Sequence, residues 1–256
     1  MFQRAILRTP APNFADGLTT VDFGIPDYQA TLAQHAAYQT ALRRCGLELE
    51  VLEPDPVYPD STFVEDAAVL TPHSAILTNP GAPSRKGEVE GLRPALERHY
   101  TKIRRITAPG TLDGGDICEA GSHFFIGLSQ RTNREGARQL AAFLAEDGYT
   151  ASTVEVKDVP GILHLKSGIA WLGEKDLVLI DAFVGRPEFA GYRVIPVDPE
   201  ENYAANCLRV NDAVLIPAGY PRLQERIERL GYATLGLDMS EYRKMDGGLS
   251  CLSLRL

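Results

Sequence analysis

Short apolar runs and amphipathic stretches alternate along the chain, and the same order recurs five times. Each unit starts with an apolar run that leads into a loop rich in Gly, Pro and Arg, followed by an amphipathic stretch and a second apolar run. The five opening segments are AILRTP (5–10), AILTNPGAPSR (75–85), FFIGLSQRTN (124–133), LVLIDAFVGRP (177–187) and AVLIPAGYPR (213–222). Apolar runs bounded by Gly and Pro are typical of strands, so the pattern predicts an internal repeat of strand, helix and strand.

The amphipathic stretches predict a helix in most of the units. Apolar residues at helical spacing, each set closed by a glycine, predict helices around residues 35–45, 137–144 and 223–230. The second unit, residues 87–100, contains Pro94, which predicts a helix that is kinked or starts late. The fourth unit, after Pro187, has room for no more than a turn of helix.

A further apolar run precedes each of the last four units and is joined to it by a short turn. These pairs predict hairpins over residues 63–78, 116–127, 167–180 and 206–217. The first unit has no such partner upstream, whereas the run SCLSLRL (250–256) is unpaired at the other end of the chain. Pairing it with the N-terminal strand would make five equivalent units and close them into a ring without exposed sheet edges.

The entry of each hairpin is the same structural place in every unit, and a ring would aim these entries at one axis. The residues predicted to converge there are Glu65, Asp66, Asp113, Asp116, His164 and Cys251. Carboxylates, one His and one Cys in a common cavity are typical of nucleophilic catalysis. Among the five histidines only His164 lies at such an entry, and Cys251 follows a Gly-Gly pair that lets backbone approach a ligand. The alternative is a hydrogen-bonded core histidine and a small buried thiol.

Composition narrows the class of protein. The 256 residues have ordinary globular values, 44% hydrophobic and 23% charged, which excludes disorder and leaves one large domain or two small ones. The net charge of −8 argues against nucleic acid or an anionic membrane as partner and suits a cationic small molecule. No apolar run is long enough to span a bilayer, and the N-terminus lacks the apolar region of a signal peptide. Four widely spaced cysteines predict reduced thiols in a cytoplasmic protein, without a clustered metal site.

Short motifs spread over the whole chain add a more specific indication. They are DGL (16–18), PDSTFVED (59–66), PSRKGE (83–88), APGTLDGGD (108–116), SQRTNREGARQ (129–139), LHLKSG (163–168), YAANC (203–207), PAGYPR (217–222) and EYRKMDGGLSC (241–251). Together they resemble the dimethylarginine dimethylaminohydrolases, in the guanidino-group-modifying superfamily of arginine deiminases and amidinotransferases. The resemblance implies an α/β fold, a five-bladed α/β propeller (pentein) of ββαβ-type repeats with pseudo-fivefold symmetry. It also implies one catalytic domain over residues 1–256, closed by pairing of the C-terminal with the N-terminal strand.

The resemblance assigns roles to residues at matching positions. It makes Cys251 the nucleophile, His164 the general acid and base, and Asp113 the acid that orients the histidine. The other matching positions, all on the substrate side, are Glu65, Asp66 and Asp246 near the guanidinium, Asp60 with the backbone of Leu18 and Met245 for the α-amino group, and Arg85 and Arg131 for the carboxylate. It implies no metal and no cofactor. A homodimer is what the family suggests.

The implied reaction is hydrolysis of Nω-methylated arginines, asymmetric dimethylarginine and monomethylarginine. The products are L-citrulline and dimethylamine or methylamine, through a covalent S-alkylthiouronium on the cysteine. One alternative is an arginine deiminase or another guanidine deiminase of the same superfamily. A second is a non-catalytic ring protein such as the ribosome-binding translation factor of this fold, but that class needs neither Cys251 nor His164, and its basic patch is missing from this acidic chain.

Overall fold

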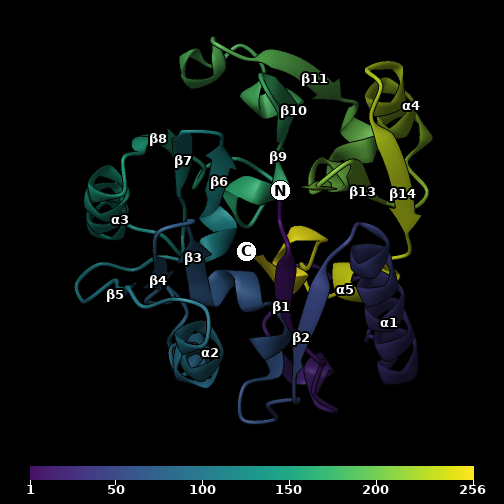
Figure 1. Cartoon of the computed structure of the whole chain (residues 1–256). Coiled ribbons are helices and arrows are strands. Elements are labelled where there is room, and N and C mark those ends of the chain that lie inside the picture. Colours follow the sequence, from purple (N-terminus) through teal and green to yellow (C-terminus); the bar gives the residue numbers. More distant parts are fainter.

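Fifteen strands form five separate three-stranded sheets that stand around a central axis (Figure 1). The computed structural model describes residues 1–256. In every sheet the middle strand pairs antiparallel with one neighbour and parallel with the other. The sheets are β15-β1-β2 (Leu254–Arg255, Arg4–Arg8, Glu48–Leu52), β3-β4-β5 (Ala68–Leu70, Ala75–Leu77, Ile103–Arg105), β6-β7-β8 (Ile117–Ala120, His123–Leu128, Thr150–Glu155), β9-β10-β11 (Ile169–Gly173, Asp176–Ile180, Arg193–Val197) and β12-β13-β14 (Leu208–Val210, Ala213–Pro217, Ala233–Leu237).

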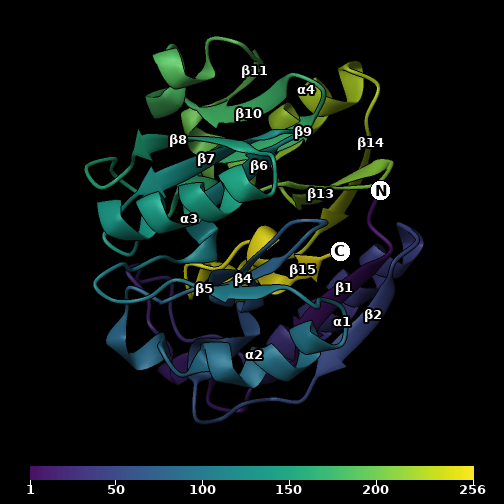
Figure 2. The same cartoon turned by 60° about the vertical axis from the view of Figure 1, so that its left-hand side comes forward.

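Helices connect the middle strand to the outer strand of four sheets and lie on the outside of the ring (Figures 1 and 2). These four helices are α1 (Tyr28–Arg44), α2 (Glu88–Glu97), α3 (Arg134–Glu146) and α4 (Pro221–Arg229); a fifth, the short α5 (Ser240–Arg243), follows β14 and leads to the last strand. The fourth unit has only 3₁₀ turns, as its length predicts. The helix α2 begins at Glu88 and contains Pro94, so it does not start late. None of these helices combines the length and the apolar character needed to cross a bilayer.

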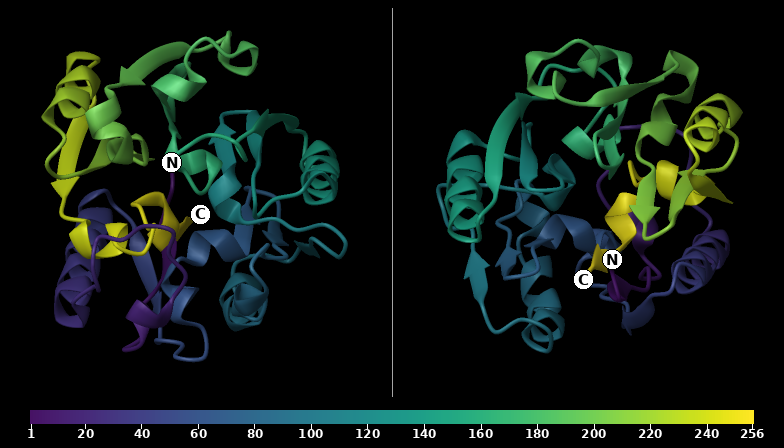
Figure 3. Two further views of the ribbon diagram at one scale, coloured as in Figure 1. Left: turned by 180° about the vertical axis from the view of Figure 1, so that it is seen from behind. Right: turned by 45° about the horizontal axis from the view of Figure 1, so that its top comes forward.

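The first sheet is completed by the last strand of the chain. β15 runs antiparallel to β1, with Ala5 opposite Arg255 and Ile6 opposite Leu254. Figure 3 shows the C-terminal segment in yellow beside the N-terminal segment in purple near the centre of the ring. Five ββαβ-type units around one axis confirm the five-bladed α/β propeller predicted from the sequence.

The apolar core is divided among the blades. Four clusters of buried hydrophobic side chains fill the spaces between neighbouring sheets and helices, and the largest contains 24 residues. The middle strands are buried on both faces, as in β10, where all five residues are buried. Burial between blades stabilises the ring while it leaves the axis itself free for polar side chains.

The hairpin entries differ from the prediction in one respect. The sequence pattern predicts strand from Phe63, Asp116, Ser167 and Asn206, but the first strand of each hairpin begins only at Ala68, Ile117, Ile169 and Leu208. 3₁₀ turns precede these strands, at residues 64–67, 114–116, 165–167 and 199–205, and a turn at 250–252 precedes β15. A strand sends successive side chains to opposite faces, whereas a tight turn lets neighbours such as Glu65 and Asp66 serve the same region.

Candidate active site

The 3₁₀ turns pack against one another around the axis and so assemble residues from all parts of the chain. Turn 250–252, which carries Cys251, packs on turn 64–67, which packs on turn 114–116. Turn 114–116 in turn packs on turn 165–167, which directly follows His164. The predicted convergence of hairpin entries therefore has a physical basis, a continuous series of turns packed one on the next.

The imidazole of His164 is paired with the carboxylate of Asp113. Nε2 of His164 lies 3.2 Å from Oδ2 of Asp113, and both side chains are buried. The other oxygen of Asp113 accepts a hydrogen bond from the backbone of Gly81 at 2.8 Å. The carboxylate is thus fixed from two sides and can orient the ring of the histidine.

Two further carboxylates surround His164. Asp66 accepts from the backbone of Gly115 at 2.9 Å, and Asp116 accepts from the backbone of Leu165, the residue after His164, at 3.0 Å. Burial alone would lower the pKa of His164, but Asp66, Asp116 and Asp113 outweigh burial and raise the pKa to about 9. At neutral pH the imidazole therefore carries a proton that it can donate.

Cys251 is partly exposed, and its backbone amide donates to the carbonyl of Gly248 at 3.2 Å. Burial of the sulfur, together with the negative charges of Glu65 and Asp66, raises the pKa of the thiol to about 12. The thiol is consequently protonated when the site holds no ligand. A cation bound beside it would favour the thiolate, which is the nucleophilic form.

Both carboxylate oxygens of Glu65 already have partners in the protein. One accepts from Nζ of Lys166 and from Nη2 of Arg255, and the other accepts from the hydroxyl of Ser250 at 2.8 Å. Glu65 is 3% exposed. Its turn packs on the turn that carries Cys251, but the hydrogen bonds of Glu65 hold the turns together and leave little capacity for a ligand.

Arg85 is buried and almost fully engaged. Nε and Nη2 donate to the two oxygens of Glu88 at 2.9 and 2.8 Å, and Nη1 donates to Asp66 at 2.6 Å. Nη2 also lies 3.3 Å from the carbonyl of Asp60. Only one N–H, on Nη1, remains for a ligand. The predicted role of Arg85 in a carboxylate clamp stays a prediction, limited by the geometry to that single donor.

Arg131 is different, because its guanidinium has a free nitrogen. Nη1 is buried without a hydrogen-bond partner and lies 3.8 Å from Oδ2 of Asp113. The loop around it is tightly packed: a side chain at Gly81 would come within 2.3 Å of the carbonyl oxygen of Arg131. A buried, unpaired guanidinium nitrogen is costly unless an anion completes it.

The predicted α-amino site gathers three segments. The backbone amide of Leu18 lies 3.1 Å from both oxygens of Asp60, an approach that Gly17 permits because a Cβ there would meet Asp60 at 2.4 Å. Asp246 accepts from the amide of Thr20 at 2.5 Å and has a positive φ of 56°. Met245 buries its side chain, and its two neighbours contact the loop that follows Leu18: the backbone carbonyl of Lys244 accepts from the hydroxyl of Thr19, and the carboxylate of Asp246 accepts from Thr20.

The structure also brings in residues that the sequence analysis did not select. These are Glu88, Lys166, Asn206, Ser250 and Arg255. All except Arg255 lie inside the motifs quoted above, and this position was the one sign in the sequence that they belong to the site. Glu88 pairs with Arg85 only three residues away, but the part of the other four in the site depends on contacts between distant segments, which no local pattern shows.

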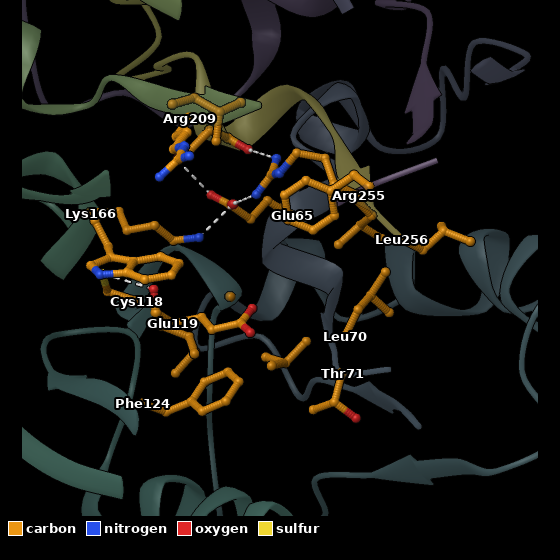
Figure 4. A pocket seen from close by; sticks show the side chains of 18 of the residues that line it. Glu65, Leu70, Thr71, Cys118, Glu119, Phe124, Lys166, Arg209, Arg255 and Leu256 are labelled. Atoms are coloured by element: carbon orange, nitrogen blue, oxygen red, sulfur yellow. Dashed lines mark hydrogen bonds and ion pairs between the residues drawn. The ribbon is translucent and has the colours of Figure 1, made fainter. Parts of the chain in front are cut away.

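Glu65, Lys166, Ser250 and Arg255 form a hydrogen-bonded layer, and a cavity of about 750 Å³ opens on one side of it. Glu65, Lys166 and Ser250 line it, whereas Cys251, His164 and Asp113 do not. Figure 4 shows Lys166 and Arg255 pointing toward Glu65 from two sides of the cavity. The layer therefore lies between the candidate catalytic residues and the cavity.

Asp66, Asp113 and His164 are the residues closest to a metal-ligand set, since one ligand atom of each lies within 4.8 Å of the others. Their donor atoms are already used, however. Arg85 and Gly115 occupy the oxygens of Asp66, and Gly81 occupies one oxygen of Asp113. A metal ion bound by all three residues would have to share these oxygens with the Arg85 guanidinium and with two backbone amides.

Comparison with known proteins agrees with this geometry. The sequence model of the family described as "N,N dimethylarginine dimethylhydrolase, eukaryotic" matches residues 27–188. The chain is 50% identical to the N(G),N(G)-dimethylarginine dimethylaminohydrolase of Pseudomonas aeruginosa, with 100% of both chains covered. Its structure is similar to a cysteine-to-serine variant of the Pseudomonas aeruginosa enzyme complexed with citrulline, and to a histidine-to-glycine variant of a dimethylarginine dimethylaminohydrolase that carries an adduct with S-methyl-L-thiocitrulline. Both have a TM-score of 0.97, 49% identity and 100% coverage of both chains. The chain therefore belongs to the dimethylarginine dimethylaminohydrolase family.

Proposed function

We propose that this chain hydrolyses Nω-methylated arginines to L-citrulline and dimethylamine or methylamine, as one catalytic domain over residues 1–256 acting in the cytoplasm. The observation that carries the proposal is the buried His164–Asp113 pair, 3.2 Å apart, in a series of packed turns that also holds Cys251. The family relatives, of which one was studied with citrulline and another with a thiocitrulline adduct, support the same chemistry.

The charges of the site suit a cationic guanidinium. Its central carbon is a poor electrophile in water, because resonance spreads the positive charge over three nitrogens. The carboxylates of Asp66 and Asp246 hold and orient the group, and the cation lowers the high pKa of the Cys251 thiol so that the thiolate forms beside it. The enzyme thus generates its nucleophile only when substrate is present.

The reaction then proceeds in two halves. The Cys251 thiolate attacks the guanidinium carbon to give a tetrahedral adduct, and His164, protonated at neutral pH, donates its proton to the departing amine. A covalent S-alkylthiouronium remains on the sulfur. Neutral His164 next takes a proton from water, the resulting hydroxide attacks the same carbon, and the C–S bond breaks to release citrulline. Asp113 holds the imidazole in place through both transfers.

Binding of the amino-acid end completes the proposal. The Arg131 guanidinium, with its unpaired Nη1, receives the α-carboxylate, together with the one free N–H of Arg85. Asp60 and the backbone of Leu18 and Met245 receive the α-ammonium group. These groups fix the distance from the amino-acid end to the guanidinium carbon and so select a side chain of arginine length.

A substrate panel tests the proposal. Asymmetric dimethylarginine, monomethylarginine and arginine are incubated in parallel, and citrulline, methylated amine and ammonia are measured separately. We expect citrulline and the amine in equal amounts from the methylated substrates, and a covalent adduct on Cys251 after acid quenching, seen by mass spectrometry. Cys251→Ala should abolish both while the fold is retained. Faster turnover of arginine with release of ammonia would instead support the deiminase alternative.

A further inference from the structure

Asn206 lies between the turn that carries Cys251 and the turn that follows His164, and it is hydrogen-bonded to both. It directly follows the 3₁₀ segment Pro199–Ala205, is 7% exposed and belongs to none of the predicted site residues. Its Oδ1 accepts from the backbone amide of Ser250 at 2.9 Å. Its Nδ2 donates to the carbonyl of Lys166 at 3.0 Å and to the hydroxyl of Ser250 at 3.1 Å. One side chain thus bonds the residue before the nucleophile and a residue two positions after the histidine.

These bonds close a circuit through Glu65. The Ser250 hydroxyl, which accepts from Asn206, donates to one oxygen of Glu65 at 2.8 Å. Nζ of Lys166, whose carbonyl accepts from Asn206, donates to the other oxygen of Glu65. Because every polar atom in the circuit has a partner, the turns of the site cannot shift independently without breaking buried hydrogen bonds.

The packing around Asn206 is equally close. A Cβ at Gly248 would lie 2.5 Å from its Oδ1 and 2.6 Å from its Cγ, so glycine at position 248 is required for the amide to reach the nucleophile turn. Gly248 belongs to the Gly-Gly pair that the sequence predicts to let backbone approach a ligand. In the structure it also lets the side chain of Asn206 approach the turn.

We propose that Asn206 is a positioning residue that fixes the nucleophile turn relative to His164, so that the proton of His164 reaches the leaving group of the covalent adduct. The proposal deepens the function proposed above and rests on it. Asn206 does not touch the reacting atoms: it acts through the backbone of Ser250 and Lys166. A displacement of about 1 Å between two catalytic groups can cost 10²-fold in rate.

The test compares Asn206→Ala with Asn211→Ala. Asn211 is a matched control, because its side chain also accepts one backbone bond and donates two, to Phe2 and Cys45, far from the catalytic residues. Its positive φ of 52° makes the control at least as demanding structurally. We expect kcat with dimethylarginine to fall about 10²-fold in Asn206→Ala with little change in KM, and to stay near wild type in Asn211→Ala.

A leaving-group comparison separates positioning from general loosening. Dimethylamine must be protonated to depart, whereas the thiolate released from S-methyl-L-thiocitrulline can leave without a proton. Asn206→Ala should therefore lose much more activity on dimethylarginine than on the thiocitrulline. Ser250→Ala keeps the backbone bond to Asn206 but removes the hydroxyl bonds, and it should show the same selectivity with a smaller loss, which keeps the test valid if Asn206→Ala folds poorly.

Alkylation of Cys251 by iodoacetamide provides a readout that needs no substrate. Freed from Asn206, the nucleophile turn should expose its thiol, so the site-specific alkylation rate should rise several-fold in Asn206→Ala but not in Asn211→Ala. Equal losses on both leaving groups, or kinetics and alkylation like the control, would overturn the inference. If Cys251 were alkylated faster in Asn206→Ala than in wild type, but the wild type turned over no methylarginine, the proposed function would be wrong. The role of Asn206 in fixing the turn of Cys251 would still hold.

Discussion

Arg85 and Arg131 lie at matching positions in neighbouring blades, yet their guanidinium groups differ in how many partners they have within the protein. Arg85 bonds two buried carboxylates, Asp66 and Glu88, and has one N–H left. Arg131 has a buried Nη1 with no partner and only a distant contact, 3.8 Å, to Asp113. Arg85 therefore pairs mainly with acids of the protein itself, whereas Arg131 keeps a nitrogen free for the anion that we propose it binds. On this proposal, equivalent places in the repeat serve mainly stability in one blade and mainly binding in the next.

Arg85 pairs with two buried acids, and the pKa values of these acids are shifted in opposite directions. Burial would raise the pKa of Asp66, but Arg85, His164 and the backbone amide of Gly115 together outweigh burial and lower it to about 2. Burial together with the nearby Asp60 and Asp66 raises the pKa of Glu88 to about 7, although Glu88 also contacts Arg85. One positive charge between two acids stabilises Asp66 fully and Glu88 only in part.

Removal of Arg85 should have the largest effect. Arg85→Ala leaves two buried acids without a cation, so we expect the free energy of unfolding to fall by about 3–5 kcal/mol, measured by urea denaturation. Arg93→Ala removes an exposed arginine on α2 that pairs with Glu97 and should change stability little. If Arg85→Ala proved as stable as that control and only raised KM, the contrast between the two arginines would be wrong.

Removal of Arg131 should affect binding instead of stability. Nη1 of Arg131 has no partner in the protein, and we propose that it binds the α-carboxylate of the substrate. Arg131→Ala should therefore raise KM for dimethylarginine about 10–100-fold, which corresponds to the loss of one hydrogen bond to a charged group, with kcat changed far less. Thermal unfolding should match wild type, and Arg134→Ala, an exposed arginine 80% accessible in the same segment, should change neither property.

A substrate without the carboxylate sharpens this prediction. Nω,Nω-dimethylagmatine has no group for Arg131 to bind, so wild type and Arg131→Ala should process it with the same kcat/KM. An equal loss on both substrates would show that Arg131 acts on the catalytic residues, through Asp113, and not on the amino-acid end.

The sequence predicted the ring and much of the site because both follow local rules. Repeated apolar runs, short turns and one unpaired C-terminal run predict five blades, and they place His164 and Cys251 at equivalent entries. The two arginines were indistinguishable by loop position. A local difference was nevertheless present: the residue three positions after Arg85 is Glu88, whereas the residue three positions after Arg131 is Arg134. The circuit through Asn206 could not be foreseen, because it joins four turns far apart in the chain.

The pH dependence of stability tests how the positive charge of Arg85 is divided between Asp66 and Glu88, and its expected effect is the smallest of the four. The pKa of Glu88 is about 7 in the folded protein, against the ordinary 4.5 expected in the unfolded chain, so the folded state binds the extra proton between these values. The free energy of unfolding of wild type should therefore fall, relative to Glu88→Gln, as pH rises from about 4.5 to about 7, and the difference should level off above that range. Glu90→Gln, on the exposed face of α2, controls for the loss of one charge. A wild type that gains stability relative to Glu88→Gln over the same range would show that the Arg85 charge serves both acids equally.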